Sequence, residues 1–465
     1  MIFEQYYLDC LSQASYLVGD ETTGRAVVVD PRRDVDVYVD DAAAAGLSIE
    51  LVIETHFHAD FLSGHLELAR RTGAEIAYGE AAGTTEFPSR KLADGERISL
   101  GDVTLEVRAT PGHTPESISI VVYEHGDDDT PWGVLTGDTL FIGDVGRPDL
   151  LASVGRTPQE LGHMLYDSLH TKLMTLPGSV RVFPAHGAGS ACGKNLSTET
   201  QSTIGEQLRT NYALADVDRD DFVALVTEGQ PAAPGYFLYD ASRNRQLRPL
   251  LQDQEAPAAI TLDGLVAARD AGAVVLDTRS PEDFARGHVV GSVNVGLGGR
   301  FAEYAGSVAG PDDRIVLVCE PGTEVEAKVR LARIGYDQVV GALGDPYPAM
   351  QDHPEHVGVA SRLTASALAD VLVRPDRGVQ LVDVRNPGEV AGGTIPGAVH
   401  IPLARLRLEL DTLDPGAPTV VYCAGGYRSS IAASLLRARG FVDVSDLVGG
   451  YGAWTTTRPT SAPAP

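Results

Sequence analysis

The chain has few cysteines and no long hydrophobic segment. Its 465 residues include four cysteines, Cys10, Cys192, Cys319 and Cys423, which lack the paired spacing of a zinc-binding motif. The first residues, MIFEQYYLDC, are too polar for a signal peptide, so we expect reduced thiols in a cytoplasmic protein. No apolar run approaches the ~20 residues of a membrane-spanning helix, which argues against an integral membrane protein.

Basic residues are also scarce. The 37 lysines and arginines are outnumbered by 64 aspartates and glutamates, which gives a formal net charge of −27. A surface with this excess of negative charge repels phosphate backbones and anionic lipid. We therefore expect neither nucleic acid nor a membrane as a partner, and we attribute the acidity to solubility.

The chain is too long for a single hydrophobic core, and its pattern predicts three domains. Residues 1–255 alternate strand-like runs such as RAVVVD and LVIETH with helical stretches, which predicts an αββα sandwich. The polar stretch LLQDQEAPAA closes this part and is typical of a linker. Two small α/β domains with parallel sheets are expected to follow, over residues 256–358 and 359–465.

An internal repeat supports the last two domains. VVLDTRSPEDFARGHVVGSVNV parallels QLVDVRNPGEVAGGTIPGAVHIP, and RIVLVCEPG further along parallels TVVYCAGG. This alignment pairs Asp277 with Asp383 and Cys319 with Cys423. Each copy alternates strands and helices, as small parallel sheets do. The final residues, TTTRPTSAPAP, are expected to form a disordered tail.

Four segments of the first part contain potential metal ligands. The segments are THFHAD, TPGHTPES, TGDTLF and FPAHGAG, and each follows or ends an apolar strand, so a rigid sheet would present the ligands at one edge. A lone HxH motif is a weak indication, but four ordered segments predict a metal site. The potential ligands are His56, His58, Asp60, His113, Asp138 and His186.

The residue after Asp60 bears on the number of metals. A two-metal hydrolase with this pattern would carry a histidine there, whereas this chain has Phe61, whose ring cannot coordinate a metal. The second metal position is therefore weakened while the first survives. One metal held by two histidines and one carboxylate is an oxygen-activating arrangement.

Residues 1 to about 240 resemble the metallo-β-lactamase superfamily, and THFHADFLSGH, TPGHTPES, GDTLFIGDVGRPDL and PAHGAGSACGK resemble the persulfide dioxygenases within it. Many members of that family carry histidine where Phe61 stands. The resemblance implies one Fe(II) per chain, and an activity that oxidises a low-molecular-weight thiol persulfide to sulfite with O₂. The implied iron ligands are His56, His113 and Asp138.

The same resemblance implies roles for the residues around the iron. His58, Asp60 and His186 would surround the ligands or act as alternative ligands. Arg147 and Asp149 match a family pair beside the active site, which would orient the anionic substrate unless the two side chains simply pair with one another. Relatives of this kind also imply a homo-oligomer.

A second candidate site follows the strand-like run TVVY near the C-terminus. Cys423 begins the loop CAGGYRS ahead of a helical stretch, and backbone N–H groups of such a loop form a cradle for an anion. Arg428 adds positive charge at its rim. Residues 360–455 resemble the rhodanese sulfurtransferases, which implies that Cys423 carries sulfur as a persulfide. The cradle residues are Ala424, Gly425, Gly426 and Tyr427.

The equivalent loop of the first copy, CEPGTEVE, has the opposite character. Glu324 stands where the arginine is expected, Glu320 and Glu326 add negative charge, and Pro321 removes an N–H donor. We expect the pKa of Cys319 to be raised and this copy to be a degenerate rhodanese that serves as a scaffold. In the first domain, Cys192 follows His186 and would either relay sulfur beside the metal or be structural.

The sequence therefore predicts a persulfide dioxygenase joined to a sulfurtransferase that forms or consumes thiosulfate during sulfide detoxification. The thiol carrier is glutathione or another small thiol. One alternative is a zinc-dependent thioester hydrolase of the glyoxalase II type, which needs two metals. The other is a non-catalytic sulfur carrier or scaffold. Persulfide transfer that persists without O₂ uptake would favour this second alternative.

Overall fold

The computed structural model describes residues 1–150, 155–374 and 378–457. The chain forms two compact units, one made of Met1–Pro231 and Phe237–Leu251, the other of Ala232–Tyr236 and Gln252–Pro465. The second unit contains both copies of the repeat. The division of that unit between residues 358 and 359 stays a prediction.

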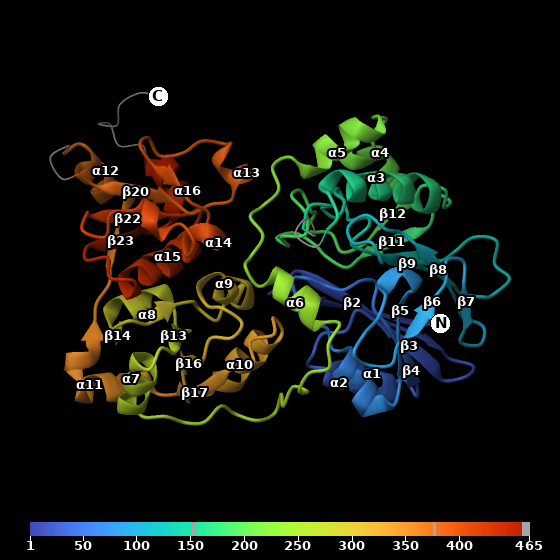
Figure 1. The fold of residues 1–465 in the computed structure, drawn as a ribbon, viewed down its shortest axis with the longest axis horizontal. Coiled ribbons are helices and arrows are strands. Elements are labelled where there is room, and N and C mark those ends of the chain that lie inside the picture. The colour runs from blue at the N-terminus through green and yellow to red at the C-terminus, as the bar shows by residue number, and fades with distance from the viewer. Residues whose placement is uncertain (151–154, 375–377, 458–465) are drawn as a thin grey trace. The chain divides into compact units, whose positions relative to one another are not determined.

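Two sheets, six-stranded over the described residues, form the middle of the first unit (Figure 1). Valines and leucines from both sheets share one hydrophobic core, including Val27, Val29, Leu105 and Val107. In spatial order the strands of the first sheet are β1 (Ile2–Leu8), β2 (Gln13–Asp20), β3 (Arg25–Val29), β4 (Ser48–Ile53), β5 (Glu75–Gly79) and β6 (Arg90–Leu92). Those of the second are β12 (Ser202–Thr203), β11 (Arg181–Pro184), β10 (Gly133–Gly137), β9 (Ile118–Tyr123), β8 (Thr104–Ala109) and β7 (Arg97–Ser99).

Helices cover the outer face of each sheet (Figure 1). Tyr38 of α1 and Leu68 of α2 pack with Val28 on one outer face, and Leu165 of α3 and Phe222 of α5 pack with the other sheet. The predicted αββα sandwich is confirmed. The helices of this unit are α1 (Asp36–Ala44), α2 (His65–Thr72), α3 (Pro158–Ser168), α4 (Ile204–Thr210), α5 (Arg219–Thr227) and α6 (Phe237–Arg243).

The first copy of the repeat forms a parallel sheet, as predicted. Its strand order is β15 (Val293–Asn294), β13 (Val274–Asp277), β16 (Ile315–Val318) and β17 (Val339–Leu343). A short antiparallel pair, β14 (His288–Val289) and β18 (Val357–Gly358), lies apart from that sheet. Its helices are α7 (Leu262–Asp270), α8 (Pro281–Arg286), α9 (Phe301–Val308), α10 (Glu324–Ala332) and α11 (Pro346–Asp352).

The second copy repeats this arrangement, and Cys423 follows β22 as Cys319 follows β16. Its parallel sheet has the order β19 (Ser361–Leu363), β23 (Val444–Leu447), β22 (Thr419–Tyr422), β20 (Gln380–Asp383) and β21 (Val399–His400). The helices are α12 (Ala365–Leu372), α13 (Pro387–Val390), α14 (Leu403–Leu406), α15 (Tyr427–Ala438) and α16 (Gly450–Thr457).

The prediction of a disordered tail was wrong for the first three residues of that tail. Thr455–Thr457 close α16, and their side-chain hydroxyls donate to backbone carbonyls three or four residues back within the helix. The remaining part of the predicted tail, residues 458–465, lies outside the described residues.

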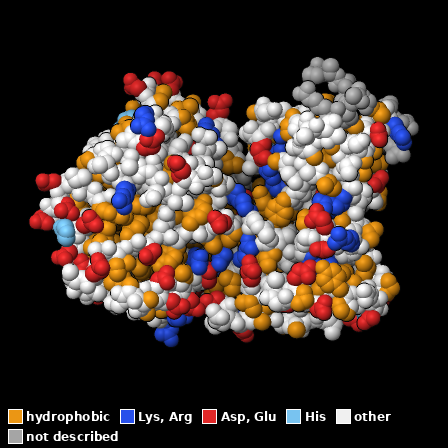
Figure 2. Space-filling model, turned by 180° about the vertical axis from the view of Figure 1, so that it is seen from behind, with side chains coloured by type: hydrophobic (Ala, Val, Ile, Leu, Met, Phe, Trp, Pro, Cys, Tyr) orange, Lys and Arg blue, Asp and Glu red, His pale blue; other side chains and the backbone are white. Residues whose placement is uncertain are grey.

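The surface is consistent with the acidic composition. On the face drawn in Figure 2, acidic side chains are scattered rather than gathered in one patch. Among the described residues, no helix has both the length and the apolar character needed to cross a bilayer.

Candidate metal centre and sulfur-transfer loop

Strand ends of the first unit carry the predicted metal ligands. His56 and His58 lie in the loop after β4, and His113 lies in the loop after β8. Asp138 directly follows β10, and His186 comes shortly after β11. All five side chains are buried. Because paired strands hold the loop ends in register, residues distant in sequence converge at this position.

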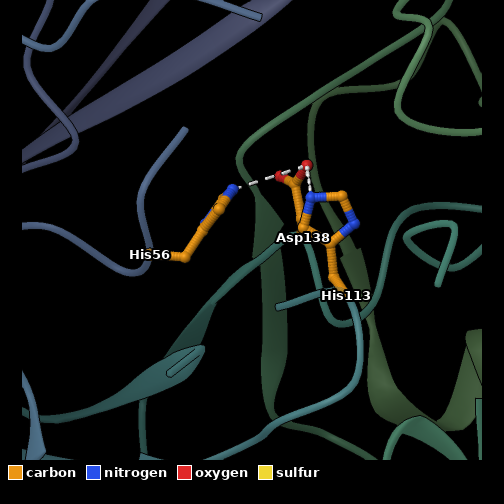
Figure 3. A group of neighbouring side chains, drawn as sticks. All are labelled: His56, His113 and Asp138. Atoms are coloured by element: carbon orange, nitrogen blue, oxygen red, sulfur yellow. Dashed lines mark ion pairs between the residues drawn. The ribbon is translucent and has the colours of Figure 1, made fainter. Parts of the chain in front are cut away.

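Three of these side chains form a group suited to one metal ion. The ligand atoms of His56, His113 and Asp138 lie within 4.8 Å of one another. Asp138 Oδ2 is 3.9 Å from His56 Nε2 and 3.4 Å from His113 Nε2, and both imidazoles point toward the carboxylate (Figure 3). His56 Nε2 and both Asp138 oxygens are buried without a hydrogen-bond partner. Such orphaned polar atoms are costly, and a bound cation would satisfy them.

Hydrogen bonds orient both histidines for coordination. His113 Nδ1 donates to the carbonyl of Arg147 at 2.9 Å. Thr55 Oγ1 donates to Asp30 Oδ2 at 2.8 Å, so it accepts from His56 Nδ1 at 3.0 Å. Both contacts place the proton on Nδ1 and leave the Nε2 lone pair free toward Asp138. The residues therefore fit a metal.

Burial also sets the charge of these ligands. It lowers the pKa of His56 well below its ordinary value and lowers the pKa of His113 to about 4, so both rings are neutral near pH 7. Burial raises the pKa of Asp138 to about 6, with Asp60 adding to the rise. A carboxyl with this pKa is mostly ionised at pH 7, so two neutral imidazoles and one carboxylate face one another, in the protonation states that bind a divalent ion.

His58, Asp60 and His186 form a neighbouring group, with ligand atoms also within 4.8 Å of one another. His58 Nε2, however, is 3.0 Å from Asp30 Oδ1 and 3.5 Å from Glu54 Oε2. Burial disfavours charge on His58, but the charge of Asp30 and its hydrogen bond to the ring, with a smaller contribution from Glu54, outweigh it and raise the pKa to about 9. Asp30 is the main partner, because burial raises the pKa of Glu54 well above its ordinary value. A protonated imidazole offers no lone pair, so His58 is a poor ligand.

Asp30 and Glu54, which contact His58, were not singled out by the sequence analysis. Both are fully buried acids at the ends of apolar runs, RAVVVD and LVIETH, which is a signal that could have singled them out. Phe61 is buried as well, with its ring centroid 4.3 Å from that of His58. Phe61 thus offers no ligand atom beside this second group, and His58 is paired with two acidic side chains, while the loss of the second metal position stays a prediction.

Arg147 and Asp149 are bound to each other by two hydrogen bonds of 2.7 Å. Arg147 is buried, and its guanidinium also donates to the carbonyls of Ala191 and Pro231. Its backbone carbonyl accepts from His113. The pair thus stabilises the loop that positions a ligand, while its role in binding substrate stays a prediction.

Cys192 lies beside the candidate metal ligands Asp138 and His186. Its sulfur belongs with Asp138 and His186 to a group of atoms within 4.8 Å of one another. Burial raises the pKa of this thiol well above its ordinary value, and the nearby Asp60 and Asp138 add to the rise. Without a metal, Cys192 is therefore an uncharged thiol at neutral pH.

The second copy of the repeat holds Cys423 in a loop with one backbone N–H directed at its sulfur. The Gly426 N–H points at Cys423 Sγ over 3.1 Å, and Sγ is 3.7 Å from Ser429 Oγ. Gly426 has φ +104°, a left-handed conformation that favours glycine, and an added Cβ would lie 3.2 Å from Gly449 N. The turn into α15 thus brings a backbone donor to the sulfur, as a cradle requires.

Arg428 lies at this loop but is not a lone cation. Its two terminal nitrogens bind both carboxylate oxygens of Glu389 at 2.7 and 2.6 Å. The sequence analysis missed Glu389, which lies in RNPGEV and also caps α13. This bidentate pair offsets part of the arginine's charge and fixes its orientation.

The corresponding cysteine of the first copy is fully buried. Burial raises the pKa of Cys319 to about 11, and Glu324 adds to the rise. The direction agrees with the prediction, although burial rather than the acidic loop is the largest cause. Glu324 accepts from the Gly322 N–H, and Glu320 accepts from the Tyr347 hydroxyl at 2.7 Å. Carboxylates therefore stand where the other copy has an arginine.

We expect iodoacetamide to leave Cys319 unmodified in the folded protein at pH 8. With a pKa of about 11, only about one Cys319 thiol in a thousand is ionised at that pH, and the thiolate is the reactive form. Mass spectrometry of the cysteine-containing peptides measures the modification. Urea-unfolded protein is the control, and equal labelling of Cys319 in folded and unfolded protein would contradict the prediction.

Comparisons with known proteins cover both units. The metallo-beta-lactamase superfamily model matches residues 8–186, and the model of the rhodanese-like domain matches residues 261–345 and 367–457. The human mitochondrial persulfide dioxygenase ETHE1 is 32% identical over 218 residues, 46% of this chain and 75% of that protein. A beta-lactamase hydrolase-like protein from Xylella fastidiosa is 30% identical over 244 residues, 46% of this chain and 52% of that protein, so the chain spans about half of its length.

A solved structure is similar over more of the chain. The crystal structure of a metallo-beta-lactamase from Staphylococcus aureus shares 33% identity at a TM-score of 0.67, over 74% of this chain and 99% of that one. The αββα fold and the buried histidine–aspartate group define a metalloprotein. The chain belongs to the metallo-beta-lactamase superfamily, and it carries two rhodanese-like domains after that domain.

Proposed function

We propose that the chain is a persulfide dioxygenase that uses one Fe(II) held by His56, His113 and Asp138. The observation that carries this proposal is a buried group of two neutral imidazoles and one carboxylate with unpartnered atoms. A ferrous ion bound there would supply the activation of O₂, which zinc cannot do because it has no redox chemistry. Overall, a persulfide RSSH, O₂ and water give RSH, sulfite and two protons.

The protein's own residues hold this site in one protonation state. The hydrogen bonds of Thr55 and of the Arg147 carbonyl keep the coordinating nitrogens of His56 and His113 free of protons. Because all three ligands are buried, bulk water has little access to the site. The similarity to human ETHE1 supports the same reaction class.

The proposal extends to sulfur transfer by the second rhodanese-like domain. Cys423 would carry a sulfane sulfur as a persulfide anion within its loop, and pass it to sulfite to form thiosulfate or accept it in the reverse direction. The first rhodanese-like domain, with Cys319 protonated and Glu324 beside it, would act as a scaffold. Joining both activities in one cytoplasmic chain raises the local concentration of a labile intermediate.

Metal analysis of anaerobically purified protein tests the dioxygenase. We expect one iron per chain, and O₂ uptake with glutathione persulfide that matches the sulfite formed. A Cys423 variant separates the directions of sulfur transfer, since accumulated sulfite favours thiosulfate synthesis. Two zinc ions per chain with thioester turnover and no O₂ uptake would instead support a hydrolase of the glyoxalase II type.

Phe61→His is expected to raise the zinc content of zinc-saturated protein from one toward two per chain. Asp60 and His186, whose Oδ2 and Nε2 atoms lie 3.4 Å apart, would gain a third ligand, and tetrahedral zinc needs at least three from the protein. Plasma emission spectroscopy on dialysed protein gives the ratio. Phe57→His is the matched control, because Phe57 stacks on Tyr78 with ring centroids 4.5 Å apart. An unchanged ratio in Phe61→His would show that Phe61 does not limit the second position.

A further inference from the structure

The first rhodanese-like domain contacts the Cys423 loop through the segment that joins β15 to α9. The Tyr427 hydroxyl donates to the carbonyls of Gly296 and Gly298 at 2.5 and 3.0 Å. One turn further along α15, Ser430 Oγ donates to Asn294 Oδ1 at 2.7 Å. Tyr427 immediately follows the glycine that points at Cys423 Sγ. The inactive copy therefore touches the loop that holds the active cysteine.

This segment is also held firmly by its own domain. The Arg330 guanidinium donates to the carbonyls of Leu297 and Gly299, and it lies over the ring of Phe301, the first residue of α9. Arg330 is largely buried. The start of α9 is thereby fixed in place beside the loop of the other copy.

Tyr304, one turn into α9, lies at this contact. Its ring packs edge-on against Tyr427, with centroids 5.5 Å apart and planes at 67°. Because Tyr427 directly follows Gly426 of the Cys423 loop, this ring contact places Tyr304 at that loop. Burial raises the pKa of the Tyr304 hydroxyl to about 12, so the hydroxyl stays protonated at neutral pH. Within the described part of the chain, no hydrogen bond occupies this hydroxyl. Tyr304 is thus a free donor at the site.

The site needs such a donor. The terminal nitrogens of Arg428 are engaged by the two oxygens of Glu389, so this cation is already partly neutralised. A sulfonate group presents three oxygens and at least one negative charge, which buried sites bind through several hydrogen-bond donors. The backbone N–H of Gly426 is directed at the cysteine sulfur instead.

We propose that Tyr304 of the first rhodanese-like domain binds the sulfonate group of the anionic sulfur substrate of Cys423. The inactive copy thereby supplies a substrate-binding residue to the active one. In the reaction, the Cys423 thiolate attacks the sulfane sulfur of thiosulfate and forms a new S–S bond. The bond to the sulfonate sulfur breaks, and sulfite leaves with the electron pair. The Tyr304 hydroxyl donates to a sulfonate oxygen throughout, and to a sulfite oxygen in the reverse direction.

Tyr304→Phe in the full chain tests this inference, because it removes the hydroxyl and keeps the ring against Tyr427. We expect KM for thiosulfate to rise about tenfold, the size of one lost hydrogen bond to a charged group, with kcat changed much less. Tyr347→Phe is the matched control: its hydroxyl lies in the same domain but binds Glu320 beside Cys319. An unchanged KM in Tyr304→Phe, or equal rises in both variants, would overturn the inference.

A second readout separates anion binding from a structural effect. Alkylation of Cys423 by anionic iodoacetate should slow several-fold in Tyr304→Phe, whereas alkylation by uncharged iodoacetamide should keep its wild-type rate. A parallel loss with both reagents would indicate a distorted loop and count against the inference. The inference rests on the proposed role of Cys423, and the two fail differently. Absence of transfer in wild-type protein defeats that role, whereas wild-type transfer with an indifferent Tyr304→Phe defeats only the inference.

Discussion

Cys423→Ser is expected to abolish sulfur transfer from thiosulfate, by about a thousandfold or more, while Cys319→Ser leaves it within about twofold. A serine hydroxyl is a far weaker nucleophile than a thiolate and cannot carry sulfane sulfur as a persulfide. Cys423 has the Gly426 N–H aimed at its sulfur, and Arg428 is the second residue of α15, which begins directly after this loop. Burial and Glu324 instead raise the pKa of Cys319 to about 11, which disfavours its thiolate.

The measurement is the rate of thiosulfate-to-cyanide sulfur transfer, together with intact-mass detection of the extra sulfur atom on the protein. The two serine variants are each other's matched control, because both cysteines follow the same strand of the repeat and both are buried. Equal losses of transfer in the two variants would refute the assignment of a single active copy.

His113→Ala is expected to remove iron and O₂ uptake while thiosulfate-to-cyanide transfer keeps its wild-type rate. The substitution deletes one of the three proposed ligands and leaves His56 and Asp138 as the remaining two of that group. Removing a group that hydrogen-bonds to a metal ligand already lowers the affinity for the metal about 10- to 100-fold. Removing the ligand itself should therefore lower that affinity at least about a hundredfold. The sulfur transfer proposed for Cys423 would use side chains of the other unit and would need no iron.

Iron content by plasma emission spectroscopy and O₂ consumption with glutathione persulfide measure the effect. His163→Ala is the matched control, since His163 is a histidine of the same unit that pairs with Asp220 at the surface. Full iron content in His113→Ala would show that the ligands lie elsewhere. A collapse of sulfur transfer in the same variant would show that the two activities are not separable.

Several features of this chain were predictable because they depend on the local pattern of apolar and polar residues. The αββα sandwich follows from strand-like and helical runs in alternation, and the parallel sheets follow from a repeat that pairs Asp277 with Asp383. The ligand positions were predictable for the same reason, because a histidine or aspartate that follows an apolar strand lies at the edge of the sheet. His56, His113 and Asp138 meet for that reason.

Other features depend on partners that no local pattern identifies. Phe61 alone suggested a weakened second metal position, and the structure adds that His58 is paired with Asp30 and Glu54. The sequence pattern left open whether Arg147 and Asp149 orient the substrate or pair with one another. In the structure the two side chains are bound to each other. Motif spacing specifies which groups are present but leaves their protonation and pairing undefined.

The pattern and spacing of the sequence alone predicted the layered fold and the repeated small domains. They also predicted the order of possible metal ligands and the contrast between the two cysteine loops. Folding in three dimensions added the pairing of His58 with Asp30, the Glu389 carboxylate bound to Arg428, and the packing of Tyr304 against Tyr427. The reason is physical: periodicity records which face of an element is buried. Charge and hydrogen bonding arise between groups that meet only when distant segments pack together.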